Sequence, residues 1–384
     1  MNWSGADSAA SEMPPRHPAD GRLCPVLGTA RDVISSLMSR HHVPGLSLAV
    51  TDTERVLFAE GFGSADLAAG RPATPETRYL WFSMSKIATA TAAMTLVDTG
   101  RLDLDEPVDS AIRGCRSRRG DRAVVRQLLN HTAGAGNPLP LRWVLPADAS
   151  SDGAREAAAA ILARHGRPRR PPGGPARYSN IGYLALAQVI ERASGQRFED
   201  FVRRAVLEPA GMSSTGYAVP IGGDLATGYV RMPRPLAPLL RVVVPASIVG
   251  ERRGDQVALR PFRVAGAGYG GLIGPVGDAV RLLRLHLADG EIDGNRVLAA
   301  GTTRAMRRID TPGKPFDLGL GWFRRAADRD ATPPFVEHWG TGGGFWNAMR
   351  LYPDLGLGIV VMANTTRAYD HSALMGAVIR SLTR

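Results

Sequence analysis

Lysine is almost absent from this chain. Of the 47 lysine and arginine residues, only Lys86 and Lys314 are lysines. Arginine stays protonated in proteins, whereas a lysine amine can lose its proton once burial lowers its pKa. A GC-rich coding sequence also favours arginine, so the scarcity alone is no evidence of function. Lys86, however, lies in an apolar stretch, and a lysine kept there in an arginine-rich chain is a candidate base.

Cysteine is equally scarce, and long apolar runs are absent. Cys24 and Cys115 offer neither a disulfide framework nor thiolates at metal-binding spacing. No apolar run reaches the roughly 20 residues of a membrane-spanning helix. Residues 1–22 are rich in Ala, Ser, Pro and charge, and lack the basic start and apolar segment of a secretion signal. We therefore expect a disordered tail over residues 1–22, no membrane span and a cytoplasmic location.

Acidic residues are too few to balance the arginines, and the net charge is +11. Arginine runs at residues 113–126 and 164–177 suggest attraction to nucleic acid, anionic lipid or an anionic substrate, or else a solvated surface. Both runs contain Gly, the second also contains Pro, and neither has an aromatic residue, so they provide no stacking platform for single strands. We favour the solvated surface and expect no nucleic-acid partner.

The hydrophobic pattern predicts strands at both ends of the chain and helices between them. Such an arrangement predicts an α/β fold of the α+β type, in which the N- and C-terminal parts form one antiparallel sheet flanked by helices. A mainly helical lobe is inserted between those parts. We expect one domain over residues 23–384, with a sheet lobe at about 23–75 and 265–384 and a helical lobe at about 76–264. The helices are predicted at 29–42, 83–99, after Asn180, 276–287 and 370–382, and the strands at 46–50, 56–59, 240–244, 318–323, 348–352 and 357–362.

Ser83 and Lys86 form a Ser-x-x-Lys pattern at the start of a predicted helix. Residues three apart share a helix face, so the Lys86 amine should lie beside the Ser83 hydroxyl. The free N–H groups and positive potential of the helix start, together with the apolar neighbours, disfavour a charged ammonium. A neutral Lys86 could then accept the Ser83 proton and produce an activated nucleophile.

Two further clusters suit this chemistry. Residues 178–180 read Tyr-Ser-Asn; a tyrosine near a lysine can act as an acid or base, and an asparagine amide can orient a substrate carbonyl. Residues 338–345 are rich in glycine, which lets a strand edge approach a ligand closely. We expect the backbone N–H groups of Ser83 and Thr341 to form an oxyanion hole.

In this order, the three clusters resemble the active-site motifs of the serine β-lactamase and penicillin-binding-protein superfamily. The similarity is closest to its class C β-lactamase and family VIII esterase branch, and it covers about residues 30–384. Beyond the three clusters, the segments similar to the family are Val43–Ser47, Gly100–Val108, Leu128–Gly134, Gly270–Ile273 and Leu357–Asn364.

The resemblance implies a role for each matching residue. Ser83 would be the acylated nucleophile, Lys86 its base partner, and Tyr178 the acid/base for the leaving group and the attacking water. The resemblance also implies a set of substrate-binding residues, namely Asn180, His338, Gly340 and Thr341.

Two residues depart from the β-lactamase pattern. His338 occupies the place of a lysine of class C β-lactamases, and a histidine is mostly uncharged at neutral pH, so it is a weaker anchor for a substrate carboxylate. Trp339 is bulkier than the Thr or Ser found there and narrows the site. Both departures favour the esterase, peptidase or acyl-transfer branches over a dedicated β-lactamase.

These observations predict a serine hydrolase that forms an acyl-enzyme, with small or medium carboxylic esters as the first choice of substrate. A D-aminopeptidase or β-lactamase-type amide hydrolase and an acyl-transferring transesterase remain open, because loop shape and water exclusion select the acceptor. A non-catalytic ligand-binding protein is the alternative from another class, and the intact Ser-x-x-Lys argues against it. We expect no metal and no cofactor, a small-molecule ester or amide as the partner, and leave the oligomeric state open.

Three other features have a structural and a functional interpretation. Residues 266–271 match a dinucleotide-binding glycine pattern, but Pro261 interrupts the approach and Gly274-Pro275 separates it from the next helix. His131 could be a base, and Asn364 could face the substrate. We favour the structural interpretation for all three.

Overall fold

The computed structural model describes residues 20–108, 122–139, 143–220, 222 and 224–382. The chain divides into two compact units, residues 41–369 and a smaller unit of residues 1–40 with 370–384. In the smaller unit, α1 (Asp20–His41) begins before the predicted start at residue 29, and α11 (His371–Leu382) confirms the predicted C-terminal helix. Most of the expected tail, residues 1–19, and the start of the first arginine run lie outside the described residues.

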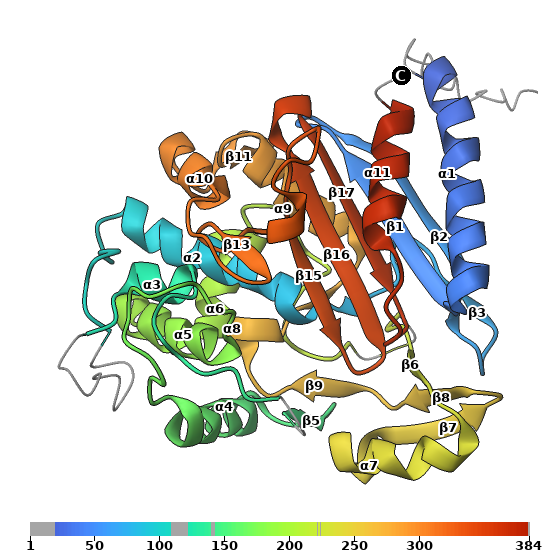
Figure 1. Ribbon diagram of the computed structural model, residues 1–384, viewed down its shortest axis with the longest axis horizontal. Coiled ribbons are helices and arrows are strands. Elements are labelled where there is room, and N and C mark those ends of the chain that lie inside the picture. Colours follow the sequence, from blue (N-terminus) through green and yellow to red (C-terminus); the bar gives the residue numbers. More distant parts are fainter. Residues whose placement is uncertain (1–19, 109–121, 140–142, 221, 223, 383–384) are drawn as a thin grey trace, which may run out of the picture. The chain divides into compact units, whose positions relative to one another are not determined.

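Among the described residues of the larger unit, eight antiparallel strands form one sheet in the order β13-β14-β15-β16-β17-β1-β2-β3 (Figure 1). Strand β1 pairs with β17, Leu48 opposite Val361, so the two ends of the chain meet in the middle of the sheet. This pairing confirms the predicted antiparallel sheet formed by N- and C-terminal segments. The strands are β1 (Gly45–Thr51), β2 (Val56–Asp66), β3 (Arg71–Pro72), β13 (Phe316–Leu318), β14 (Phe323–Arg325), β15 (Val336–Gly342), β16 (Phe345–Tyr352) and β17 (Leu357–Ala363).

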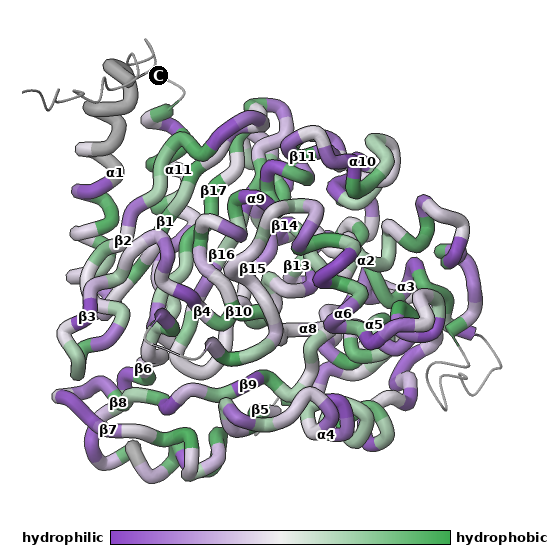
Figure 2. Tube along the Cα trace, turned by 180° about the vertical axis from the view of Figure 1, so that it is seen from behind, coloured by the Kyte–Doolittle hydropathy of each residue, from purple (hydrophilic) through white to green (hydrophobic). Residues whose placement is uncertain are grey.

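The inner strands are buried almost along their whole length. Every residue of β1 and all but the first of β17 are buried, which explains why their sequences are mainly apolar. The hydrophobic colouring of these stretches can be followed in Figure 2. Helix α9 (Val276–Leu287), predicted with the same bounds, packs on β1, β16 and β17.

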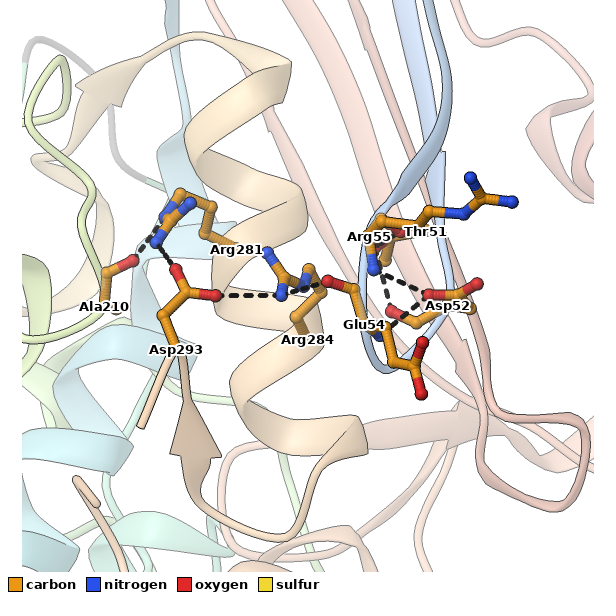
Figure 3. Close-up of polar contacts among 8 residues, drawn as sticks. All are labelled: Thr51, Asp52, Glu54, Arg55, Ala210, Arg281, Arg284 and Asp293. Carbon is orange, nitrogen blue, oxygen red and sulfur yellow. Dashed lines mark hydrogen bonds and ion pairs between the residues drawn. The ribbon is translucent and has the colours of Figure 1, made fainter. Parts of the chain in front are cut away.

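Two arginines of α9 connect this helix to its surroundings (Figure 3). Arg284 donates to the Glu54 carbonyl in the β1–β2 turn and, at 3.0 Å, to Asp293. Arg281 also pairs with Asp293 and donates to the Ala210 carbonyl. Arg284 therefore connects α9 to the hairpin of β1 and β2, and Asp293 binds both arginines.

The inserted region, residues 76–264, contains helices and small sheets, and further short elements follow it. Its long helices are α2 (Ser85–Asp98), α4 (Ser151–His165) and α5 (Asn180–Ser194), of which α2 and α5 pack on each other. The short helices are α3 (Val125–Leu129), α6 (Phe198–Val202), α7 (Leu240–Val243), α8 (Ala267–Gly270) and α10 (Ala300–Arg307). The small sheets pair β4 (Tyr79–Leu80) with β10 (Ile273–Gly274), β5 (Val144–Pro146) with β9 (Phe262–Val264), β11 (Glu291–Ile292) with β12 (Asn295–Arg296), and β8 (Gln256–Leu259) with both β6 (Gly228–Arg231) and β7 (Val249–Arg253).

Two strand predictions are wrong. Residues 240–243 form α7, because Leu240 and Val244 are buried and the three residues between them are exposed, which is a helical pattern of burial. Residues 318–323 do not form one strand: β13 ends at Leu318, and a turn with Gly321 at φ +102° leads into β14. Among the described helices, none has the length and apolar character needed to cross a membrane.

Candidate active site

Ser83 lies in a 3₁₀ turn, η1 (Phe82–Met84), that leads directly into α2. The preceding residue, Phe82, has φ +46°, a left-handed conformation that costs a non-glycine residue of order 1–3 kcal/mol. Such strain persists only where the surrounding structure imposes it. The turn leaves Ser83 half-buried, while Phe82 and Met84 on either side are buried.

Lys86 is completely buried one helical turn after Ser83. Its Nζ lies 3.1 Å from Ser83 Oγ, 2.8 Å from Asn180 Oδ1 and 2.9 Å from the Tyr269 carbonyl oxygen. Burial lowers the pKa of Lys86 well below its usual value, and no carboxylate among the described residues pairs with it. The two carbonyl oxygens only accept, so in the neutral form of Lys86 they would receive its two N–H bonds. The remaining lone pair of that amine then faces the Ser83 hydroxyl.

Tyr178 lies on the other side of Ser83. Its hydroxyl forms a hydrogen bond with the Ser83 side chain, and its ring centroid is 4.8 Å from Lys86 Nζ. Burial raises the pKa of Tyr178 above its usual value, so the phenol is protonated at neutral pH. The arrangement provides a continuous path for protons between Lys86, Ser83 and Tyr178.

Helix α5 presents Asn180 to this group. The side chain of Ser179 caps the helix by accepting from the Gly182 N–H at 3.1 Å, and Asn180 is the first helical residue. The Asn180 N–H donates to Asn137 Oδ1 at 3.0 Å. Asn180 is therefore held at both ends, with its side-chain oxygen fixed on Lys86.

His131 supports Tyr178 from behind. Its ring centroid lies 4.6 Å from that of Tyr178, its carbonyl accepts from the Arg177 N–H at 3.0 Å, and its Nδ1 accepts from the Ser179 N–H at 3.1 Å. Burial lowers the pKa of His131 to about 3, so the ring is neutral. These contacts agree with the structural interpretation of this histidine.

His338 lies on β15 and is 1% exposed. Its Nδ1–H donates to the Trp339 carbonyl at 2.8 Å, which leaves Nε2 as an acceptor without a hydrogen-bond partner among the described residues. Burial lowers the pKa of His338 well below its usual value. The ring centroid of His338 is 6.1 Å from that of Tyr178. His338 therefore places a neutral hydrogen-bond acceptor beside Tyr178, whereas a cationic side chain at this position could bind a substrate carboxylate.

Two glycines let β15 approach the turn that carries Ser83. A Cβ at Gly340 would lie 1.8 Å from the Trp81 carbonyl oxygen, and one at Gly342 would lie 2.1 Å from the Phe82 ring. Only glycine fits at either position. Thr341, between them, therefore lies next to η1, and its side chain is exposed.

Aromatic side chains form one wall of the site. The Phe316 ring centroid lies 6.1 Å from that of Tyr178 and 5.3 Å from that of Trp339. Phe323 packs between His338 and Trp339, at 4.6 Å and 5.4 Å. Trp339 thus extends an apolar surface from the site toward β14 and the edge strand β13.

The structure brings together the residues predicted at Ser83, Lys86, Tyr178, Asn180 and His338. Sequence reasoning missed Asn137 and the Tyr269 carbonyl, although Tyr269 lies within the glycine-rich residues 266–271. These residues form α8 and the turn before β10, where a Cβ at Gly268 would lie 2.6 Å from the Tyr183 carbonyl oxygen. Their glycines permit close helix packing.

Asn364 has a structural role at the end of β17. It is fully buried, its Oδ1 accepts from the Gly45 N–H at 2.7 Å, and its Nδ2 donates to the Ser64 and Ala65 carbonyls. Within the part of the chain that the structure describes, no three His, Cys, Asp or Glu side chains are grouped as metal ligands.

Comparisons with known proteins agree with this geometry. Residues 30–382 match the family model described as Beta-lactamase. The chain is 28% identical to penicillin-binding protein 4 of Amycolatopsis lactamdurans, over 86% of this chain and 83% of the relative, and 28% identical to esterase EstB of Burkholderia gladioli, over 88% and 90%. Among solved structures, the octameric penicillin-binding protein homologue from Pyrococcus abyssi superimposes with a TM-score of 0.76 at 25% identity, covering 93% of this chain and 78% of that one. The chain therefore belongs to the beta-lactamase family of serine hydrolases.

Proposed function

We propose that this protein is an esterase that forms an acyl-enzyme on Ser83. The observation that carries the proposal is the environment of Lys86, whose two other partners, Asn180 Oδ1 and the Tyr269 carbonyl, can only accept hydrogen bonds. A buried neutral amine held in this way directs its lone pair at Ser83 Oγ.

In the acylation step, Ser83 Oγ attacks the ester carbonyl while its proton moves to Lys86. The negative charge that develops on the carbonyl oxygen is stabilised by the backbone N–H groups of Ser83 and Thr341. When the intermediate collapses, Tyr178 donates its proton to the departing alkoxide and is reprotonated from Lys86. The products of this step are an alcohol and an ester of Ser83.

Water completes the cycle. As the water oxygen attacks the acyl carbon, the water gives a proton to Tyr178, which passes its own proton to Lys86. Lys86 then returns that proton to Ser83 Oγ as the acyl–oxygen bond breaks. The carboxylic acid departs and the free hydroxyl is restored, so one water is consumed for each ester cleaved. Asn180 binds the substrate through the amide group that also holds Lys86.

The surroundings of the site favour neutral esters over carboxylate substrates. His338 is an uncharged acceptor, and Trp339 with Phe316 and Phe323 offers an apolar surface for an acyl or alkyl group. An amide hydrolase or a transesterase on the same fold would use the same residues. The esterase of Burkholderia gladioli among the relatives supports the choice of an ester.

The test uses chromogenic short-chain nitrophenyl esters and a chromogenic cephalosporin, with intact-mass analysis for the acyl-enzyme. We expect ester turnover, a mass adduct on Ser83 and little cephalosporin cleavage. Turnover that survives in Ser83→Ala would refute the mechanism. Cephalosporin cleavage at a similar rate would favour the amide hydrolase, and a protein that binds these compounds without turnover or adduct would be a binding protein.

A further inference from the structure

The segment of residues 234–243 exposes an unusual amount of apolar surface. Seven large hydrophobic side chains are exposed among the described residues, and four of them lie in this segment. The segment consists of a 3₁₀ helix, η3 (Arg234–Leu239), followed by α7, at the edge of the molecule beside β7 and β8 (Figure 1). The four side chains and their exposed fractions are Leu236 (47%), Leu239 (56%), Val242 (64%) and Val243 (46%).

These four side chains share one side of the segment. In a 3₁₀ helix, residues three apart are eclipsed, which aligns Leu236 with Leu239. In the α-helical turn that follows, residues three and four apart are neighbours, which continues the stripe to Val242 and Val243. The opposite side is anchored in the core through Leu240, which is 5% exposed. The exposed stripe is therefore a stable feature of a packed segment.

The polar residues of the segment are cationic. Arg234 and Arg241 are exposed, and neither forms a hydrogen bond or ion pair with any of the described residues. From residue 225 to residue 250 the sequence has three arginines and neither Asp nor Glu. The third of these arginines, Arg231, pairs with Asp255. The exposed face thus combines aliphatic side chains with two uncompensated positive charges.

We propose that residues 234–243 dock this protein on an anionic lipid surface. The aliphatic stripe would enter the boundary between headgroups and acyl chains, where short amphipathic segments bind. Arg234 and Arg241 would lie at the level of the lipid phosphates, to which a guanidinium donates two parallel hydrogen bonds. Such peripheral docking requires no membrane-spanning helix.

A second copy of the same chain fits this face less well. The commonest contact between identical chains is two-fold symmetric and places a patch against itself. Arg234 and Arg241 would then face their own copies, with no acidic residue of the segment to separate them. Like charges brought together in this way oppose association, whereas an anionic surface attracts both.

The docking segment is connected to the candidate active site through the chain that follows it. Strand β8 ends at Leu259 and β9 begins at Phe262, whose ring centroid is 6.3 Å from that of Phe82. The strands that follow the docking segment therefore lead to a side chain that packs against the residue next to Ser83. Docking itself does not depend on the proposed esterase function, and it is measured as binding.

Flotation with vesicles tests the proposal on the full-length protein. We expect binding to vesicles of equal parts phosphatidylcholine and phosphatidylglycerol, and weaker binding to vesicles of phosphatidylcholine alone. At high salt, the partition coefficients on the two kinds of vesicle should become equal. The double variant Leu239→Ser/Val242→Ser should lower the partition coefficient at least about tenfold. Arg241→Gln should lower it about fivefold on the anionic vesicles and leave phosphatidylcholine binding unchanged.

Leu355→Ser is the matched control, since Leu355 is an exposed leucine (38%) on a different turn, and it should bind as the unsubstituted protein does. Far-UV circular dichroism and urea unfolding verify that each variant is folded, independently of any esterase activity. Absence of binding to anionic vesicles, or full binding by the double variant, would overturn the proposal. A concentration-dependent dimer that the double variant abolishes, without vesicle binding, would instead assign the segment to a second copy of the chain.

Discussion

The imidazole of His131 holds the Tyr178 ring in place, with the two ring centroids 4.6 Å apart. The same residue also accepts hydrogen bonds from the N–H groups of Arg177 and Ser179, the residues on either side of Tyr178. Because it has φ +58°, its own backbone conformation is one that few residue types adopt. His131 is therefore a positioning residue that fixes where the Tyr178 hydroxyl meets Ser83.

Substitutions at His131 should separate the hydrogen bond from the ring contact. His131→Asn keeps an acceptor near the Ser179 N–H and suits positive φ, so we expect a moderate fall in kcat, of about tenfold, with little change in KM. His131→Phe keeps a ring but leaves a buried N–H unpaired, which should cost about 1–3 kcal/mol of stability. Steady-state kinetics, urea unfolding and the alkaline limb of the pH–rate profile measure these effects.

His131→Ala removes both contacts and serves as the reference. If positioning is the role of His131, the asparagine variant should recover part of the kcat lost in the alanine variant. The alkaline limb of the pH–rate profile should also lie at a different pH in these two variants. Equal kcat in the alanine variant and the unsubstituted protein would contradict a positioning role.

The two lysines of the chain form a natural pair of test and control. Lys86→Met removes the base and should lower kcat/KM by about 10²–10⁴-fold, and Lys86→Arg should do the same because a guanidinium stays protonated. Lys314 is exposed, so Lys314→Met should leave kcat/KM unchanged. Full activity of Lys86→Arg would mean that a positive charge suffices at that position.

The spacing of Ser83 and Lys86 could be predicted because it is a local property of one helix. Their other contacts could not, since Asn180 and Tyr269 are 94 and 183 residues away from Lys86 in the sequence. Which carbonyl oxygens surround the Lys86 amine depends on how distant parts of the chain fold together. The order of the motifs indicated which residues meet, and the structure adds the orientation of each group.

The central strands could be predicted for a different reason. Residues 46–50 and 357–362 are apolar apart from Ser47, and such runs suit strands that are buried on both faces. Residues 240–244 are also apolar apart from one residue, Arg241, but residues 240–243 form α7 and residues 241–243 are exposed. Composition alone cannot distinguish a buried strand from a short surface helix, because exposure is a property of the whole fold.

Buried histidines should make the folded state sensitive to acid. The pKa values of His131 and His286 are lowered to about 3 by burial, whereas an unfolded histidine titrates near 6.5. Between these values the unfolded chain binds more protons, so the free energy of unfolding falls as the pH decreases below about 6.5. Each histidine should contribute roughly 4–5 kcal/mol to this loss by the time the pH reaches about 3.

Urea unfolding at a series of pH values measures how steeply the free energy of unfolding changes with pH. His286→Gln should flatten it below pH ~6.5, even though the variant also loses the contacts of His286 with Thr91 and Trp322 at neutral pH. An unfolding free energy independent of pH between about 6.5 and 4 would show that these rings are protonated in the folded protein.

Gly340 determines how closely β15 approaches η1, the 3₁₀ turn that contains Ser83. In Gly340→Ala the new methyl group would lie 1.8 Å from the Trp81 carbonyl oxygen, which is backbone and cannot rotate away. The strand must therefore move from η1, and Thr341 moves with it. We expect stability to fall by about 1–3 kcal/mol, as in other overpacked sites. Loss of one oxyanion donor should lower kcat by about 10²–10³-fold.

Gly277→Ala is the matched control for this substitution. A Cβ at Gly277 on α9 would have no other atom within 4 Å, so this variant should be stabilised by about 0.5–1 kcal/mol with unchanged kcat. The comparison separates a general effect of removing a glycine from the displacement of β15. If Gly340→Ala remained folded with full kcat, neither the close approach of β15 nor the N–H of Thr341 would contribute to the stabilisation of the transition state.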